Sequence, residues 1–126
     1  MILWYELLYF IINATNRRNI ANVICNSDVC IRHSVNSDED RVEYLQFKAD
    51  GSFVNVQDDE DGINIQHGTW KLTDNEIILR IQDGKLAGST FTYTVSEIGT
   101  DKLTVSMWGV TAYLIRVPDS EIEKYL

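Results

Sequence analysis

Two cysteines and a histidine lie close together in the first third of the chain. Four residues separate Cys25 from Cys30, and His33 follows them. A structural zinc site normally has four ligands, and the other histidine, His67, falls in a different segment. A nucleophilic Cys–His pair needs an orienting third group, and the sequence places none beside it. We therefore predict no metal site and no catalytic residue here, while a small-loop disulfide and two reduced thiols are both open.

An acidic run, Asp58-Asp59-Glu60-Asp61-Gly62, is the second candidate for chemistry. An EF-hand loop with Gly62 at its sixth position would begin at Gln57 and end at Gly68, and neither residue supplies the carboxylate that those positions need. The run is better interpreted as a solvated loop between two strands, where its charge discourages edge-to-edge pairing.

The charge balance limits the possible partners. The 126 residues include 11 Lys and Arg against 19 Asp and Glu, for a net charge of −8. Nucleic-acid binding depends on clustered Lys and Arg, so we expect no nucleic-acid partner. The sequence has no phosphate-binding glycine loop, nucleophile elbow or dinucleotide fingerprint, and it has no apolar run long enough for a membrane-spanning helix. We expect a single domain over residues 1–126 that is not an enzyme and needs no cofactor.

Glycine placement and alternation indicate the elements that position these residues. All seven glycines lie after residue 50, between short runs rich in β-branched and aromatic residues. Apolar and polar residues alternate along these runs, as in strands with one buried face. The pattern predicts seven antiparallel strands between residues 42 and 117, with Gly68 bending or bulging one of them. Four residues on the apolar sides of these strands are predicted to lie in the core: Phe47, Trp70, Leu79 and Leu103.

The clearest hairpin turns at Asp50-Gly51. A two-residue turn places Phe47 opposite Val54 and Leu45 opposite Val56, which makes one face wholly apolar. A three-residue turn with a bulge pairs Phe47 with Phe53 and Leu45 with Asn55 instead. We prefer the first register because its pattern is cleaner.

Seven sequential antiparallel strands form a long sheet, and such sheets tend to curl and close. One more strand from the first forty residues would make eight, enough for a small barrel. The first candidate for this strand is the stretch around Trp4, and the second is Asn19 to Ile31. Residues 1–12 are the most apolar part of the chain. We expect a structural element there rather than a secretory signal, because Glu6 interrupts the run and no basic residue precedes it.

A short helix is predicted after the last strand. Pro118 ends that strand, and Ser120 with Glu123 forms a capping box that opens a helix from Glu121 to Tyr125. Ile122 and Tyr125 lie three residues apart and would pack this helix on the barrel.

Nine aromatic residues supply bulk for a barrel interior: Trp4, Tyr44, Phe47, Phe53, Trp70, Phe91, Tyr93, Trp108 and Tyr113. They would either fill the core completely or line a cavity for an apolar ligand. The candidates for ligand binding are Trp70, Phe91 and Tyr93, which take inward positions on neighbouring strands. Tyr113 is a fourth candidate, although the turn at Trp108-Gly109 places it on the outer face.

Several short motifs occur in a characteristic order: Phe47-Lys48-Ala49-Asp50-Gly51, Gly68-Thr69-Trp70, Ile77-Ile78-Leu79 and Lys102-Leu103-Thr104-Val105. In this order they resemble the small bacterial lipocalin-like domains of the calycin group, over residues 42–117. The resemblance implies an all-β fold in which an up-and-down meander of about eight strands closes into a small barrel. It also implies a protein that is often exported, so a periplasmic or cell-envelope location is favoured.

Two functions from different classes follow. The first is a binding protein that holds a small hydrophobic molecule in the barrel interior. The second is a filled barrel that serves as a protein-interaction or structural module of the bacterial cell envelope. They differ in one observable feature, a cavity large enough for a ligand.

Overall fold

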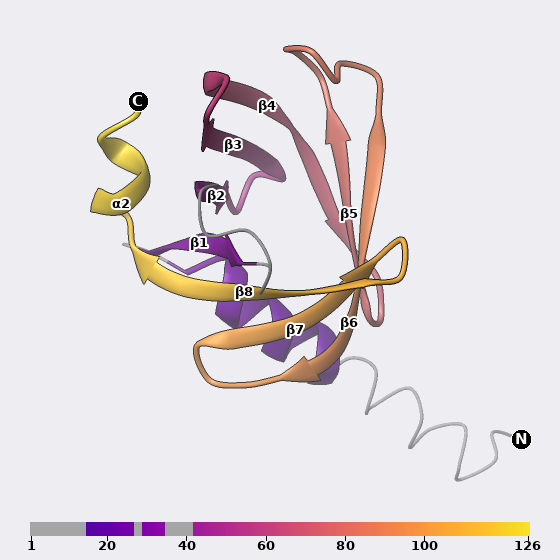
Figure 1. The fold of residues 1–126 in the computed structure, drawn as a ribbon. Helices are drawn as coiled ribbons and strands as arrows, with labels where there is room; N and C mark the ends of the chain where they lie inside the picture. Colours follow the sequence, from indigo (N-terminus) through magenta and orange to yellow (C-terminus); the bar gives the residue numbers. More distant parts are fainter. Residues whose placement is uncertain (1–14, 27–28, 35–41) are drawn as a thin grey trace, which may run out of the picture.

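A computed structural model describes residues 15–26, 29–34 and 42–126. Eight antiparallel strands form a closed barrel in which each strand pairs with the next along the chain and β8 pairs with β1 (Figure 1). The strands are β1 (Val29–Ser34), β2 (Val42–Phe47), β3 (Ser52–Asp59), β4 (Gly62–Leu72), β5 (Glu76–Ile81), β6 (Thr90–Ile98), β7 (Lys102–Met107) and β8 (Val110–Pro118). A short helix, α2 (Ser120–Glu123), follows β8. The all-β class, the meander and the closed barrel are confirmed.

The eighth strand comes from a different segment than expected. Seven strands, β2 to β8, occupy the predicted region, and β1 begins only at Val29. The second candidate, Asn19 to Ile31, is therefore wrong for most of its length, because residues 15–24 form a helix. That segment carries Ile20, Val23 and Ile24 at helical spacing, and all three are buried. The first candidate, around Trp4, lies outside the described residues.

The β2–β3 hairpin adopts the register that we did not prefer. Phe47 pairs with Phe53, and Leu45 pairs with Asn55. The Gly51 N–H donates to the Lys48 carbonyl (3.0 Å), and Gly51 has φ +89°, so the turn is three residues long and ends in a glycine bulge. In this register Asn55 points into the barrel. Val54 and Val56, on the opposite face of β3, pack on the outside of the barrel.

Gly68 does not bulge β4, which was one of the two alternatives expected at this position. The pairing of β4 with β3 and with β5 passes through Gly68 without a register shift. A Cβ atom there would lie 2.0 Å from the Arg80 carbonyl oxygen and 2.7 Å from Cε1 of Phe53. Glycine is needed because a neighbouring strand and a ring approach closely. The irregularity in the sheet lies instead between β6 and β7, at Val95 and Glu97.

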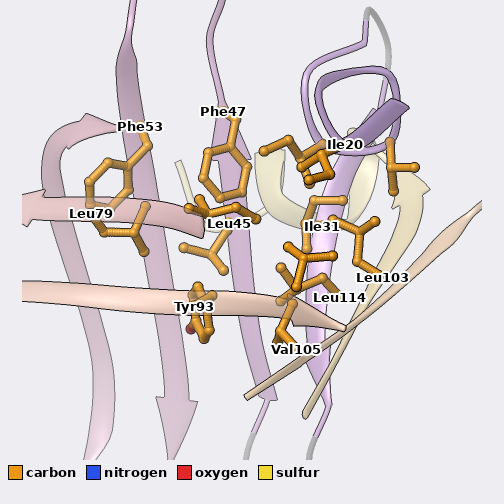
Figure 2. Close-up of a cluster of buried hydrophobic side chains, with 14 of the residues drawn as sticks. Ile20, Ile31, Leu45, Phe47, Phe53, Leu79, Tyr93, Leu103, Val105 and Leu114 are labelled. Atoms are coloured by element: carbon orange, nitrogen blue, oxygen red, sulfur yellow. The ribbon is translucent and has the colours of Figure 1, made fainter. Parts of the chain in front are cut away.

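The helix of residues 15–24 packs its apolar side chains into the barrel core. Figure 2 shows Ile20 in one cluster with Ile31, Leu45, Leu103 and Leu114. Arg17 forms an ion pair with Asp74 in the turn between β4 and β5. The helix therefore covers the end of the barrel at which Phe47 and Leu103 lie.

The four predicted core residues divide into two groups. Phe47, Leu79 and Leu103 are buried, as expected. Trp70 is half-buried and lies at the edge of the core, with its ring edge-on to Phe47 at 5.5 Å. Its indole N–H donates to the Lys48 carbonyl at 2.8 Å, so Trp70 closes the β2–β3 turn instead of filling the interior.

Helix α2 covers part of the outer face of the barrel (Figure 1). Ile122 is completely buried against Cys30, Tyr44 and Val56, with Tyr125 packed beside them. Three side-chain hydrogen bonds hold this C-terminal segment to β2 and β3: Tyr44 to Glu121 (3.1 Å), Gln46 to Asp119 (3.2 Å) and Tyr125 to Asp58 (2.9 Å). The predicted packing of Ile122 and Tyr125 on the barrel is confirmed.

The predicted capping box is wrong. The N-cap of α2 is Asp119, and no side-chain hydrogen bond caps the helix. The backbone N–H groups of Ile122 and Glu123 bond to the Asp119 carbonyl instead. Pro118 is the last residue of β8, as predicted, and the helix spans Ser120–Glu123 instead of Glu121 to Tyr125.

Candidate functional site

A cavity of about 840 Å³ occupies the barrel interior on the side away from the helix of residues 15–24. Eighteen of the described residues line it: His33, Glu43, Leu45, Phe53, Asn55, Gln57, Gln66, Leu79, Ile81, Leu86, Ser89, Thr90, Phe91, Tyr93, Met107, Trp108, Val110 and Ala112. This volume lies within the range of about 300–1,000 Å³ that is typical of small-molecule sites. The barrel is therefore not completely filled.

The cavity has two unlike walls. Strands β5 to β8 contribute apolar and aromatic side chains, among them Leu79, Phe91, Tyr93 and Ala112. Strands β1 to β4 contribute five polar side chains, which we call the polar strip: His33, Glu43, Asn55, Gln57 and Gln66. A molecule in the cavity would thus meet mostly hydrocarbon on the β5–β8 side and, on the other side, the polar strip together with Leu45 and Phe53.

Strand register brings the polar strip together. His33 lies opposite Glu43, Glu43 opposite Gln57, and Asn55 opposite Gln66. Because residues that face each other in adjacent strands point to the same side, all five side chains face inward. The strip was missed in the sequence because the preferred hairpin register turned Asn55 outward.

Glu43 is the centre of a small polar network. Its Oε1 accepts a hydrogen bond from Asn55 Nδ2 at 3.0 Å, and its Oε2 lies 3.8 Å from Nδ1 of His33. The His33 ring in turn lies 5.8 Å from the Tyr93 ring, centroid to centroid. Glu43 and Asn55 are buried, yet the side chains of His33 and Glu43 keep 17% and 11% of their exposure. A bound molecule can therefore reach both side chains.

Gln66 is the most enclosed member of the polar strip. It is completely buried, and neither atom of its amide has a hydrogen-bond partner among the described residues. Gly84, in the segment of residues 82–89 between β5 and β6, lies directly over it. A Cβ on Gly84 would approach Cγ of Gln66 to 2.9 Å.

Asp83 attaches this segment of residues 82–89 to β4. Its carboxylate accepts from the His67 backbone N–H at 2.6 Å and contacts the His67 ring Nδ1 at 2.8 Å. The His67 N–H, and then the ring, hold the pKa of the Asp83 carboxyl below its usual range. The attachment places Leu86 at the mouth of the cavity.

Exposed apolar side chains surround the mouth. Trp108 is 83% exposed, and Val110 and Leu86 are also exposed, although all three line the cavity. Trp108 has φ +51°, in the left-handed region that a bulky residue rarely adopts, and Gly109 follows with φ +78°. The Trp108 ring meets Phe91 edge-on at 5.7 Å, so the strained turn aims an aromatic side chain at the cavity.

The structure separates the four candidate binding residues into pairs. Phe91 and Tyr93 line the cavity, on the apolar wall. Trp70 is on the inner face beside Phe47 and pairs with Leu79 of the cavity wall, but does not itself line the cavity. Tyr113 is outside the cavity lining, with the Lys102 ammonium 4.7 Å above its ring. Ligand binding at these residues stays a prediction.

The other sequence candidates have simpler structural roles. Cys25 and Cys30 are free thiols. The acidic run forms the end of β3, a turn at Glu60 and Asp61, and the start of β4. No group of three or more metal-ligating side chains gathers in the part of the chain that the structure describes. Within that same part, none of the helices has the length and apolarity to cross a membrane.

The fold and its cavity define a small up-and-down β-barrel of the lipocalin type. The sequence profile of the Lipocalin-like domain family matches residues 18–105, and the chain belongs to that family. No curated protein sequence matches the chain.

Two solved structures are similar to the chain. One is a lipocalin-like protein from Bacteroides uniformis, with a TM-score of 0.49 and 18% identity, over 58% of this chain and 76% of that one. The other is an uncharacterized protein from Bacteroides eggerthii, with a TM-score of 0.46 and 18% identity, over 70% of this chain and 94% of that one.

Proposed function

We propose that this protein binds a small, largely apolar molecule inside the barrel and carries out no catalysis of its own. The observation that carries the proposal is the cavity of about 840 Å³ beside the apolar wall of β5 to β8. Burial of ligand hydrocarbon there would contribute roughly 25 cal/mol per Å² before the costs of association. Phe91 and Tyr93 are the aromatic residues that we expect to contact the ligand.

The test is titration with a neutral hydrophobic dye, N-phenyl-1-naphthylamine, combined with native mass spectrometry of the freshly purified protein. We expect saturable dye binding with one site per chain. Ala112→Phe should weaken it at least tenfold, because Ala112 lines the cavity and a phenyl ring would occupy that space. The matched control is Ala49→Phe, since Ala49 is exposed in the β2–β3 turn.

A folded wild-type protein without saturable dye binding or co-purified ligand would overturn the proposal. The filled-barrel interaction module of the cell envelope would then be the better hypothesis. Equal dye binding by wild type and Ala112→Phe would also count against the barrel interior as the site.

A further inference from the structure

The charges that face the cavity restrict the head group of a ligand. Among the described residues that line it, the charged or readily ionised side chains are Glu43 and His33, and none is Lys or Arg. Their side chains lie 3.8 Å apart. The described part of the lining therefore offers an anionic head group no Lys or Arg as a partner.

An anionic head group is poorly matched to this site. A fatty-acid carboxylate beside Glu43 would place two like charges in a partly buried space, and one of them would have to take up a proton. The chain's net charge of −8 adds long-range repulsion. A neutral or cationic head avoids both costs.

A hydrogen-bond-donating cation fits the geometry. Glu43 Oε1 accepts from Asn55 at 3.0 Å, and the Glu43 side chain keeps 11% of its exposure, so a donor in the cavity can approach the carboxylate. The opposite wall, with Leu79, Ile81 and Phe91, is suited to a hydrocarbon chain or ring.

We infer that the cavity selects amphipathic amines: the protonated amine lies at Glu43 in the polar strip, and the apolar body lies against β5 to β8. This inference rests on the proposed function and specifies its ligand class. In this inference the polar strip binds the amine, whereas a purely apolar ligand would make no hydrogen bonds to the strip.

The test uses three probes with the same chain and different heads: octylamine, octanol and octanoate. Each competes with N-phenyl-1-naphthylamine for the wild-type protein, at concentrations below micelle formation. We expect octylamine to bind at least tenfold more tightly than octanoate, with octanol between them. Glu43→Gln should weaken octylamine at least tenfold and leave octanol within about threefold, because a neutral amide keeps the shape and loses the charge.

Glu97→Gln is the matched control. Glu97 is exposed on β6, so this variant makes the same change in net charge outside the cavity. It should leave the preference for octylamine unchanged. If Glu43→Gln melts below the assay temperature, Gln57→Lys is the second variant. It places a cation opposite Glu43 in the β2–β3 register and should abolish the preference.

The two proposals fail in different ways. If the dye and octanol bind but octylamine gains nothing over octanoate, the amine inference is overturned and the binding function stands. The same holds if Glu43→Gln and Glu97→Gln reduce octylamine affinity equally. If neither the dye nor any of the three probes binds the folded wild type, the proposed function itself fails.

Discussion

Asn55 and Gln66 lie opposite each other across β3 and β4, and only one of the two amides has hydrogen-bond partners among the described residues. Asn55 Nδ2 donates to Glu43 Oε1 at 3.0 Å and lies 3.3 Å from the Tyr44 carbonyl oxygen. Gln66 is completely buried, and neither atom of its amide bonds to a described residue. A buried polar group in this state costs about 1–3 kcal/mol. The polar strip therefore contains a locally unfavourable residue.

Gln66→Met should stabilise the ligand-free protein. Methionine has a similar length and flexibility, and it removes the unbonded amide, so we expect the free energy of unfolding to rise by about 1 kcal/mol. Urea denaturation measures the change. Gln46→Met is the control, since Gln46 bonds to Asp119 on the outer face and its loss should be neutral or destabilising. A lower stability for Gln66→Met would show that the amide is bonded in solution.

Gly68→Ala should destabilise the barrel by about 3 kcal/mol or more, in the range of severe overpacking. The added Cβ would lie 2.0 Å from the Arg80 carbonyl oxygen, so β4 and β5 would have to separate. Gly62→Ala is the comparison. Gly62 has open space around it and φ +113°, so only backbone strain of about 1 kcal/mol is expected. Similar thermal midpoints for the two variants would contradict the close approach.

Trp108→Asn should raise stability and weaken dye binding in the same protein. Asparagine tolerates positive φ, and Asn-Gly is a favoured pair for a two-residue hairpin turn, so we expect a gain of about 1 kcal/mol. The substitution also removes an aromatic ring that contacts Phe91 at the mouth of the cavity. Thermal melts and dye titration on one preparation test both effects. A lower stability would mean that the packing energy lost with the Trp108 ring exceeds the backbone strain that the substitution relieves.

Protein stability should fall as the pH rises from about 9 to about 11. Burial, with a smaller contribution from Asp119, raises the pKa of the Cys30 thiol from 9.0 to about 11. Within that window the unfolded chain loses a proton that the folded protein keeps, so the unfolded state is favoured as pH increases. Burial also raises the pKa of Tyr44 and of Tyr125, and both act in the same direction.

Cys30→Ala isolates the thiol's share of this effect. Urea midpoints at about pH 8 and about pH 10.5 should differ less in Cys30→Ala than in the wild type. The two tyrosines are retained in the variant, so part of the decrease should persist. An identical decrease in both proteins would mean that Cys30 does not keep its proton in the fold.

Alternation of apolar and polar residues predicted most of the barrel, because in each strand from β5 to β8 one face is buried and the other is half-buried or exposed. It failed on β2 and β3, where both faces are buried. Val54 and Val56 pack against Ile122 outside the barrel, while Phe53 packs inside. With apolar residues on both sides, the hydrophobic pattern does not distinguish the registers, and the turn length determines the register.

The candidate site was predictable only on its apolar side. Phe91 and Tyr93 follow from alternation along β6, a strand whose pattern has one interpretation. Glu43 and Gln66 are polar residues at inward positions, and a rule that assigns polar residues to the solvent face excludes them. Only cross-strand contacts, such as the one between Asn55 and Glu43, show that these positions face the cavity.

The pairing of β1 with β8 has a consequence for how the barrel assembles. The other seven strand pairs join neighbours along the chain, but Ile31 meets Arg116 from the opposite end of the barrel sequence. Formation of the β1–β8 pair is therefore the only strand pairing that carries the entropy cost of closing a long loop. Because hairpins can form locally, we expect the seam between β1 and β8 to close late and to slow folding. The cavity would then become enclosed only when this seam forms, so the open meander would offer a ligand no enclosed site.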